Sequence, residues 1–161
     1  WSSDVCSSDL VEIVPTKDRK KHLYFKIKKI LKRKHAVSRP LAITFTKVNQ
    51  IVRGWINYFK IGSIKIFLDE FGQWLRHKIR CIIIKQWKKS MTIYRNLMKI
   101  NITCKCNFSE GDIYKCANTR LGWYRRSAMN VVNFTLSPKV LGIKKGDRPG
   151  LVHSLDYILG M

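Results

Sequence analysis

Acidic residues are scarce in this sequence. Its 161 residues include 32 Lys and Arg but only 10 Asp and Glu, which gives a formal net charge of +22 at pH 7. A chain with this charge repels itself unless a polyanion binds to it, and nucleic acid is the first candidate. The scarcity of carboxylates also argues against two-metal polymerase or nuclease chemistry, which needs several carboxylates around the ions. The adjacent pair Asp69 and Glu70 lies in a predicted helix, where neighbouring side chains diverge, so we interpret it as an ion-pair or helix-dipole feature.

Motifs for other kinds of chemistry are also missing. Neither glycine-rich phosphate-binding pattern, G-x-G-x-x-G or G-x-x-x-x-G-K-[ST], occurs. The four histidines are far apart in the sequence, and none belongs to a ligand motif. Cys104, Cys106 and Cys116 lie near one another but lack the paired C-x-x-C spacing of structural zinc sites. We therefore expect no catalytic residue, no metal and no cofactor in this chain, and the role of these three cysteines stays open.

Long apolar runs are absent as well. No stretch approaches the about 20 residues that a membrane-spanning helix needs. The five cysteines form an odd, irregular set, and no secretory leader precedes them. We therefore expect a soluble protein of a reducing compartment, cytoplasmic in a bacterium or organellar, that is not secreted and has no membrane partner.

Hydrophobic residues nevertheless make up 45% of the chain, and they recur at helical spacing. This pattern predicts an all-α fold, a basic helical bundle with an irregular C-terminal extension. The stretch 101–108 is either strand-like or irregular. The first expected helix covers 17–35, the second runs from a cap at Thr46 to Gly62, and the third runs from Ile64 to about Lys89. A turn or two of helix is expected through 93–100, and a helical stretch from Ser109 through 134. The last helix is expected to start at Ser137 and Pro138 and to break at Gly142.

The two longest predicted helices share one design, with an apolar side and a polar side. In 48–62 the apolar stripe is formed by Val48, Ile51, Val52, Trp55, Ile56 and Phe59. The opposite side of that helix carries Gln50, Arg53, Asn57 and Lys60. The solvent side of the next helix is predicted to carry Gln73, Arg76, Arg80 and Lys88. Two such helices would present cations to a phosphate backbone without weakening the core.

Three ordered segments carry a family resemblance. They are "VNQIVRGWINYFKIG" at 48–62, "FLDEFGQWLRHKIRCIIIKQWKK" at 67–89 and "NTRLGWYRRSAMNVVNF" at 118–134. Over about residues 20–145 the chain resembles the maturase-specific region, domain X, of group II intron-encoded reverse transcriptase/maturases, which are proteins of mobile genetic elements. The resemblance implies a thumb-like helical domain that binds structured group II intron RNA and promotes its splicing-competent fold. Full-length members carry an upstream reverse transcriptase domain, and some bind DNA. That domain and its Y-A-D-D-type motif are absent here, so this chain alone is not expected to be an enzyme.

The resemblance places the family's core motif on Arg53, Gly54, Trp55, Asn57 and Tyr58. Its middle helix falls on Trp74, Arg76, Arg80, Gln86, Trp87 and Lys88, and its third element on Gly122, Trp123 and Ser127. Residues predicted to contact RNA are Gln50, Arg53, Asn57, Tyr58, Lys60, Arg76, Arg80, Lys88, Arg125 and Arg126. Residues predicted to pack in the core are Trp55, Phe59, Trp74, Trp87 and Trp123. Gly54 either permits close approach of RNA or of another helix, or is simply tolerated.

The predicted organisation has four parts. Residues 1–10 read as a foreign leader, and 11–38 as a linker and first helix after a missing upstream domain. The maturase-specific helical domain covers 39–146, and 147–161 form a C-terminal tail. Two alternative functions remain. In the first, the chain is the thumb fragment of an RNA-directed DNA polymerase and grips primer and template. In the second, it is a generic DNA-binding helical module.

Overall fold

The computed structural model describes residues 13–142, 150–152 and 157, and this part of the chain is all-α, as predicted. Its regular β pairing is a single isolated parallel bridge between Gly142 and Leu151. No helix in the described ranges is long and apolar enough to cross a membrane. The helices are α1 (Lys17–Ile30), α2 (Arg33–Ala36), α3 (Leu41–Phe59), α4 (Lys65–Trp87), α5 (Ser90–Cys104), α6 (Glu110–Asn118), α7 (Trp123–Ser127), α8 (Asn130–Thr135) and α9 (Pro138–Leu141).

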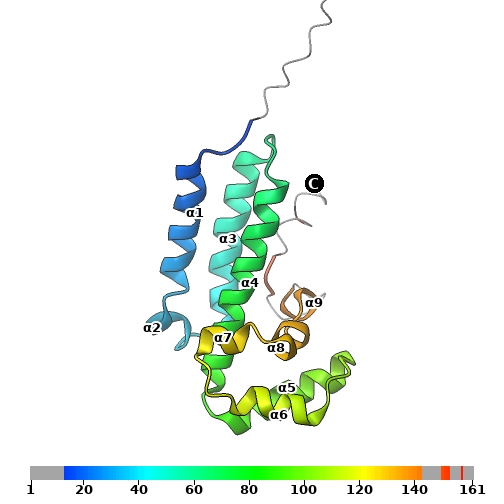
Figure 1. Cartoon of the computed structure of the whole chain (residues 1–161). Coiled ribbons are helices and arrows are strands. Elements are labelled where there is room, and N and C mark those ends of the chain that lie inside the picture. Colours follow the sequence, from blue (N-terminus) through cyan, green and yellow to red (C-terminus); the bar gives the residue numbers. More distant parts are fainter. Residues whose placement is uncertain (1–12, 143–149, 153–156, 158–161) are drawn as a thin grey trace, which may run out of the picture.

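Three long helices, α1, α3 and α4, run side by side and form the larger part of the molecule (Figure 1). The pair α5 and α6 lies across one end of them, at the bottom of the view. The short helices α7 and α8 lie between α4 and this pair, with α7 packed on α4 and α8 in contact with α4, α5 and α6. As a result, α4 is covered on more than one side.

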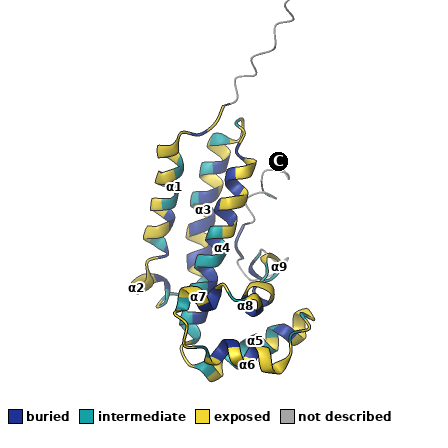
Figure 2. Ribbon diagram, viewed as in Figure 1, coloured by how far each residue is buried: buried dark blue, intermediate teal, exposed yellow. Residues whose placement is uncertain are grey.

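Aromatic side chains join the three long helices. Tyr24 of α1 meets Phe71 and Trp74 of α4 edge-on, with ring centroids 5.3 and 4.8 Å apart. Trp55 of α3 lies 5.2 Å from the ring of Phe67. Phe71 is fully buried, and buried residues line the inner faces of α3 and α4, whereas α1 is buried only at Leu23 and Ile27 (Figure 2). Aromatic pairs of this kind contribute about 0.5–1.5 kcal/mol each beyond the area they bury, so they fix how the helices pack.

Several helix boundaries differ from the sequence-based prediction. Helix α3 begins at Leu41, not near Thr46, because Pro40 precedes the first turn, where a missing N–H costs nothing. Thr46 is therefore inside the helix, and its hydroxyl donates to the carbonyl of Ala42 at 3.0 Å instead of capping an end. The first predicted helix stops at Ile30, and after a break at residues 31 and 32 the chain forms the separate short helix α2.

Corrections are larger after α4. Helix α5 has 15 residues, far more than the predicted turn or two, and includes the first part of the stretch that was left undecided between strand and irregular structure. The helical stretch expected from Ser109 through 134 is interrupted, because the chain leaves α6 at Asn118 and forms the separate helices α7 and α8. Two predicted starts are confirmed. Ser109 caps α6 by accepting a hydrogen bond from the Asp112 amide, and Pro138 begins α9, which ends before Gly142.

Part of the C-terminal extension is buried against α3. The described residues 150–152 are not helical, but each of them is buried. The Asn49 side chain holds them by donating to the carbonyl of Gly150 at 2.7 Å and accepting from the amide of Val152 at 2.9 Å. Leu151 also donates to the carbonyl of Leu141 at 2.8 Å. This short segment therefore belongs to the packed core, although no sequence pattern marked it.

Gly62 in the turn between α3 and α4 allows the N-terminal segment to pass close to the backbone. A methyl group built there would overlap the Ile13 carbonyl oxygen, which also accepts a hydrogen bond from Ser63 at 3.0 Å. We expect Gly62→Ala to lower the free energy of unfolding by about 1–2 kcal/mol in urea denaturation. Gly111→Ala is the matched control, because its added Cβ would meet only the Ser109 hydroxyl at 4.0 Å. Equal stability of the two variants would contradict this role of Gly62.

Candidate nucleic-acid interface

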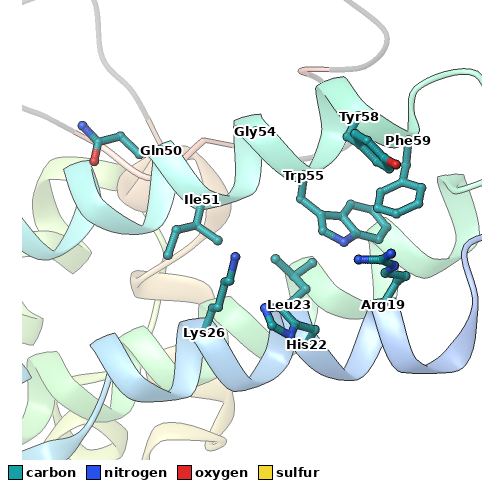
Figure 3. A pocket seen from close by; sticks show the side chains of 10 residues that line it. All are labelled: Arg19, His22, Leu23, Lys26, Gln50, Ile51, Gly54, Trp55, Tyr58 and Phe59. Atoms are coloured by element: carbon teal, nitrogen blue, oxygen red, sulfur yellow. The ribbon is translucent and has the colours of Figure 1, made fainter.

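A groove of about 420 Å³ runs between α1 and α3 (Figure 3). Its α1 side carries a basic edge formed by Arg19, His22 and Lys26, and all three side chains are exposed. Among the described residues that line it, none is a carboxylate. The lining residues are Arg19, His22, Leu23, Lys26, Gln50, Ile51, Gly54, Trp55, Tyr58 and Phe59.

Helix periodicity explains this arrangement. The three residues of the basic edge are spaced by three and four positions, so they share one side of α1 over about 10 Å. Gln50, Gly54 and Tyr58 are each four positions apart and form a ridge of α3 on the other side. Apolar side chains form the floor between them, and Figure 3 shows Trp55 reaching from α3 toward α1. The groove is therefore cationic on one side, polar on the other and apolar at its base.

Gly54 leaves a gap in the ridge of α3. Apart from the neighbouring backbone of α3 itself, a Cβ built at this position would meet no heavy atom of the described structure within 4 Å. Close approach by another helix of the described chain is thus not the reason for this glycine. The backbone at Gly54 is open to the groove, with the side chains of Gln50 and Tyr58 one turn away on either side (Figure 3). Tyr58 is 75% exposed, so its ring is available to a ligand.

The neighbouring ridge of α3 faces the C-terminal segment. Asn49, Arg53 and Asn57 are also spaced by four residues, and Asn49 holds 150–152 as described above. The Arg53 guanidinium lies 5.7 Å from the ring centroid of Tyr157, and the Tyr157 hydroxyl donates to the Asn57 side-chain oxygen at 3.5 Å. The polar face predicted from the sequence is therefore divided: Gln50 lines the groove, whereas Arg53 and Asn57 face the C-terminal segment. Lys60, at the end of α3, is exposed.

Arg80 was predicted on the solvent side of α4, and that prediction is wrong. Its side chain is only 7% exposed, because α8 and the start of α9 pack over this part of α4. Its Nε donates to the Leu136 carbonyl at 2.9 Å, and its Nη1 donates to the Asn133 side chain. Burial, and then the nearby Arg76, lower the pKa of Arg80. Arg80 therefore ties α4 to α8.

Arg126 is also buried, contrary to its predicted place on the surface. Its side chain is 8% exposed, and it donates to the carbonyl of Thr119. The guanidinium lies 5.0 Å from the ring centroid of Trp123, a residue of the same helix α7. Arg125 and Lys88 are exposed, as expected. Adjacent arginines on a short helix point in different directions, so one can be structural while the other stays in solvent.

A second cavity, of about 450 Å³, lies beside α4, α8 and α9. It is lined by Gln73, Arg76, His77, Arg80, Ala128, Asn133, Phe134, Ser137 and Pro138. Arg76 is half-buried and has interactions of its own. Burial lowers the pKa of His77, with further contributions from Lys78 and Arg80. The imidazole packs edge-on to Tyr124, with ring centroids 4.2 Å apart. Most residues that line this cavity have polar or charged side chains, but several of these side chains contact other helices.

The five aromatic residues predicted to pack in the core are half-buried and rest against the buried cluster; they are Trp55, Phe59, Trp74, Trp87 and Trp123. In the described part of the chain, no three His, Cys, Asp or Glu side chains come together where they could hold a metal ion. Cys104 and Cys106 lie near the end of α5, whereas Cys116 is buried in α6.

The sequence-based interpretation missed the α1 side of the groove. The basic residues of α1 were treated as general surface charge, although the spacing of Arg19, His22 and Lys26 was available to mark them as one edge. What the spacing could not show is that α1 packs beside α3. The pairing of the two helices brings this edge opposite Gln50 and Tyr58.

Comparison with known proteins identifies the family of this chain. A model of the family described as "Group II intron, maturase-specific domain" matches residues 20–100, which extend from α1 into α5 and include the lining residues of the groove except Arg19. No curated protein gives a significant match. Proteins of this family act in group II intron splicing, and a maturase-specific domain is not by itself a catalytic polymerase domain. The chain therefore belongs to the group II intron maturase-specific domain family.

Proposed function

We propose that this chain binds group II intron RNA and stabilises its splicing-competent fold. The observation that carries the proposal is the groove between α1 and α3, which has cations along one side and no carboxylate among its described lining residues. A polyanion can approach such a surface without meeting a like charge. The family match makes a group II intron the RNA partner to test first.

Contacts to phosphate come from exposed cations at the groove and beyond it. Arg19 and Lys26 supply the basic edge, and Lys60, Lys88 and Arg125 extend the charged surface. Gln50 and Tyr58 contact the RNA from the α3 side, because both line the groove and are exposed. Arg53, Asn57 and Arg76 remain candidates with protein contacts of their own. Arg80 and Arg126 act through the fold, since their guanidinium groups are buried and bonded to protein carbonyls.

The salt dependence of RNA binding tests the proposal. If about six phosphates are neutralised, a plot of log Kd against log salt concentration has a slope of about 4–5 for a transcribed group II intron RNA. The double variant Arg19→Gln/Lys26→Gln should reduce this slope by about 2 and weaken binding. Filter binding or fluorescence anisotropy over a range of salt concentrations measures both quantities.

The control is Lys115→Gln/Lys139→Gln, which removes the same charge from exposed positions on α6 and α9. This variant should keep a slope closer to that of the unchanged protein. A slope near zero for the unchanged protein would refute charge-driven docking. Equal losses in the two double variants would show that net charge matters but the groove does not. Equal affinity for duplex DNA of the same length would favour a generic DNA-binding module instead.

A further inference from the structure

We infer that the groove between α1 and α3 holds one unpaired base of the RNA, with the adjoining phosphates on the basic edge of α1. This inference rests on the proposed function and names the part of the RNA that the groove takes. Charge alone would suit any phosphate backbone, paired or single-stranded. The form of the groove, its apolar floor and its open backbone at Gly54 are what favour an unpaired base.

The dimensions of the groove suit a small planar group. Its volume of about 420 Å³ lies within the range of about 300–1,000 Å³ that is typical of small-ligand sites. Its floor is formed by Leu23, Ile51, Trp55 and Phe59, and the rings of Trp55 and Phe59 lie 4.5 Å apart. A paired base has both faces stacked on its neighbours, so only an unstacked base could place a face on this floor.

Gly54 gives a planar group access to the backbone of α3. Apart from the neighbouring backbone of α3, no heavy atom of the described structure lies within 4 Å of the place where its Cβ would be, so the helix presents bare backbone between two side chains. A glycine inside a helix costs about 1 kcal/mol relative to alanine. Nothing in the described packing offsets that cost. A base that enters between Gln50 and Tyr58 would use the gap directly, because any larger residue would fill the space.

The polar groups around the groove match the parts of a nucleotide. Tyr58 is exposed and can stack on the base, and such stacking does not depend on which base it is. The Gln50 amide has both a donor and an acceptor for the edge of a base. Arg19 and Lys26, on the facing helix, supply the charge for the phosphates on either side. An uncharged apolar ligand would make no ion pair with Arg19 and Lys26, and an acidic peptide without an aromatic group would not stack on Tyr58.

The test compares two RNA hairpins of equal length with the full chain. One contains a single bulged 2-aminopurine, and the other is fully paired with 2-aminopurine at the same position. We expect the bulged hairpin to bind about tenfold more tightly, and its fluorescence to fall as the base stacks in the groove. If neither hairpin nor the intron RNA binds, the proposed function fails. If both hairpins bind equally and the fluorescence of the bulge does not change, only the base-binding inference is overturned.

Gly54→Leu then assigns the base to this groove. The leucine fills the gap, so the ratio of the two affinities should fall toward one and the fluorescence change should be lost. Gly54→Ala is a second variant in case leucine disturbs folding, since its methyl group enters open space and should be tolerated by the helix. We expect it to raise the thermal midpoint while lowering the preference for the bulge. Gly111→Ala, at an exposed glycine of α6, is the control and should keep the full preference. If both Gly54 variants also keep it, the base is not held in this groove.

Discussion

Replacing Arg80 with methionine should lower the free energy of unfolding by about 2–3 kcal/mol. Methionine keeps an unbranched apolar side chain beside α8 but removes both guanidinium hydrogen bonds. The Leu136 carbonyl then loses its partner at 2.9 Å in a buried environment, which costs most of the difference. Asn133 is exposed, so its side chain can recover a hydrogen bond from water. Urea denaturation followed by circular dichroism measures the change.

Arg125→Met is the matched control for this experiment. Arg125 is exposed on α7, so its replacement should change the free energy of unfolding by less than about 0.5 kcal/mol. The effects on RNA affinity should be reversed, with the larger loss in Arg125→Met. At a temperature where both proteins stay folded, Arg80→Met should bind intron RNA almost normally. Normal stability together with a large loss of RNA binding would instead make Arg80 an RNA contact, as the sequence first indicated.

The error at Arg80 shows the limit of helical periodicity. A single apolar stripe predicts one buried side, and by that criterion Arg80 faces solvent. The structure buries Ile82, Ile83 and Ile84 in succession, which requires burial around most of the helix. That part of α4 lies between the long helices and the group formed by α7 and α8. A run of consecutive apolar residues was therefore the available sign that α4 is enclosed on most sides. By that sign, a cation next to the run, such as Arg80, is predicted to be buried.

Local signals predicted the elements, but contacts between distant segments were not predictable from them. The cap at Ser109 and the start at Pro138 were found because capping depends on a few adjacent residues. In the candidate site, Gln50 and Tyr58 were found because they share one helix. Arg19 and Lys26 were missed because their role depends on the packing of α1 beside α3. Residues 150–152 were missed because three residues without periodicity carry no pattern, and only the side chain of Asn49 identifies their position.

Asn49 connects the candidate site to the C-terminal segment, since it lies one residue before Gln50 on α3. Its ridge continues through Arg53 and Asn57 toward Tyr157, while the adjacent ridge lines the groove. One helix thus carries the C-terminal segment on one side and the proposed RNA site on the next. A change that releases the segment should affect the stability of the fold first. It should affect RNA binding only to the extent that α3 itself becomes less ordered.

Asn49→Leu should lower the free energy of unfolding by about 2–3 kcal/mol, because it leaves the Gly150 carbonyl and the Val152 amide without a partner in a buried place. Leucine has the same number and branching of side-chain heavy atoms as asparagine, so the replacement leaves no cavity. The Val152 amide should also exchange with solvent much faster, as followed by NMR, since its hydrogen bond ends on the replaced side chain.

Asn57→Leu is the control on the same helix, where the bond to Tyr157 is long at 3.5 Å and the site is exposed. It should leave both the stability and the exchange of Val152 nearly unchanged. Slow exchange of Val152 in the Asn49 variant would mean that the surrounding apolar contacts, and not this amide, hold the segment on α3.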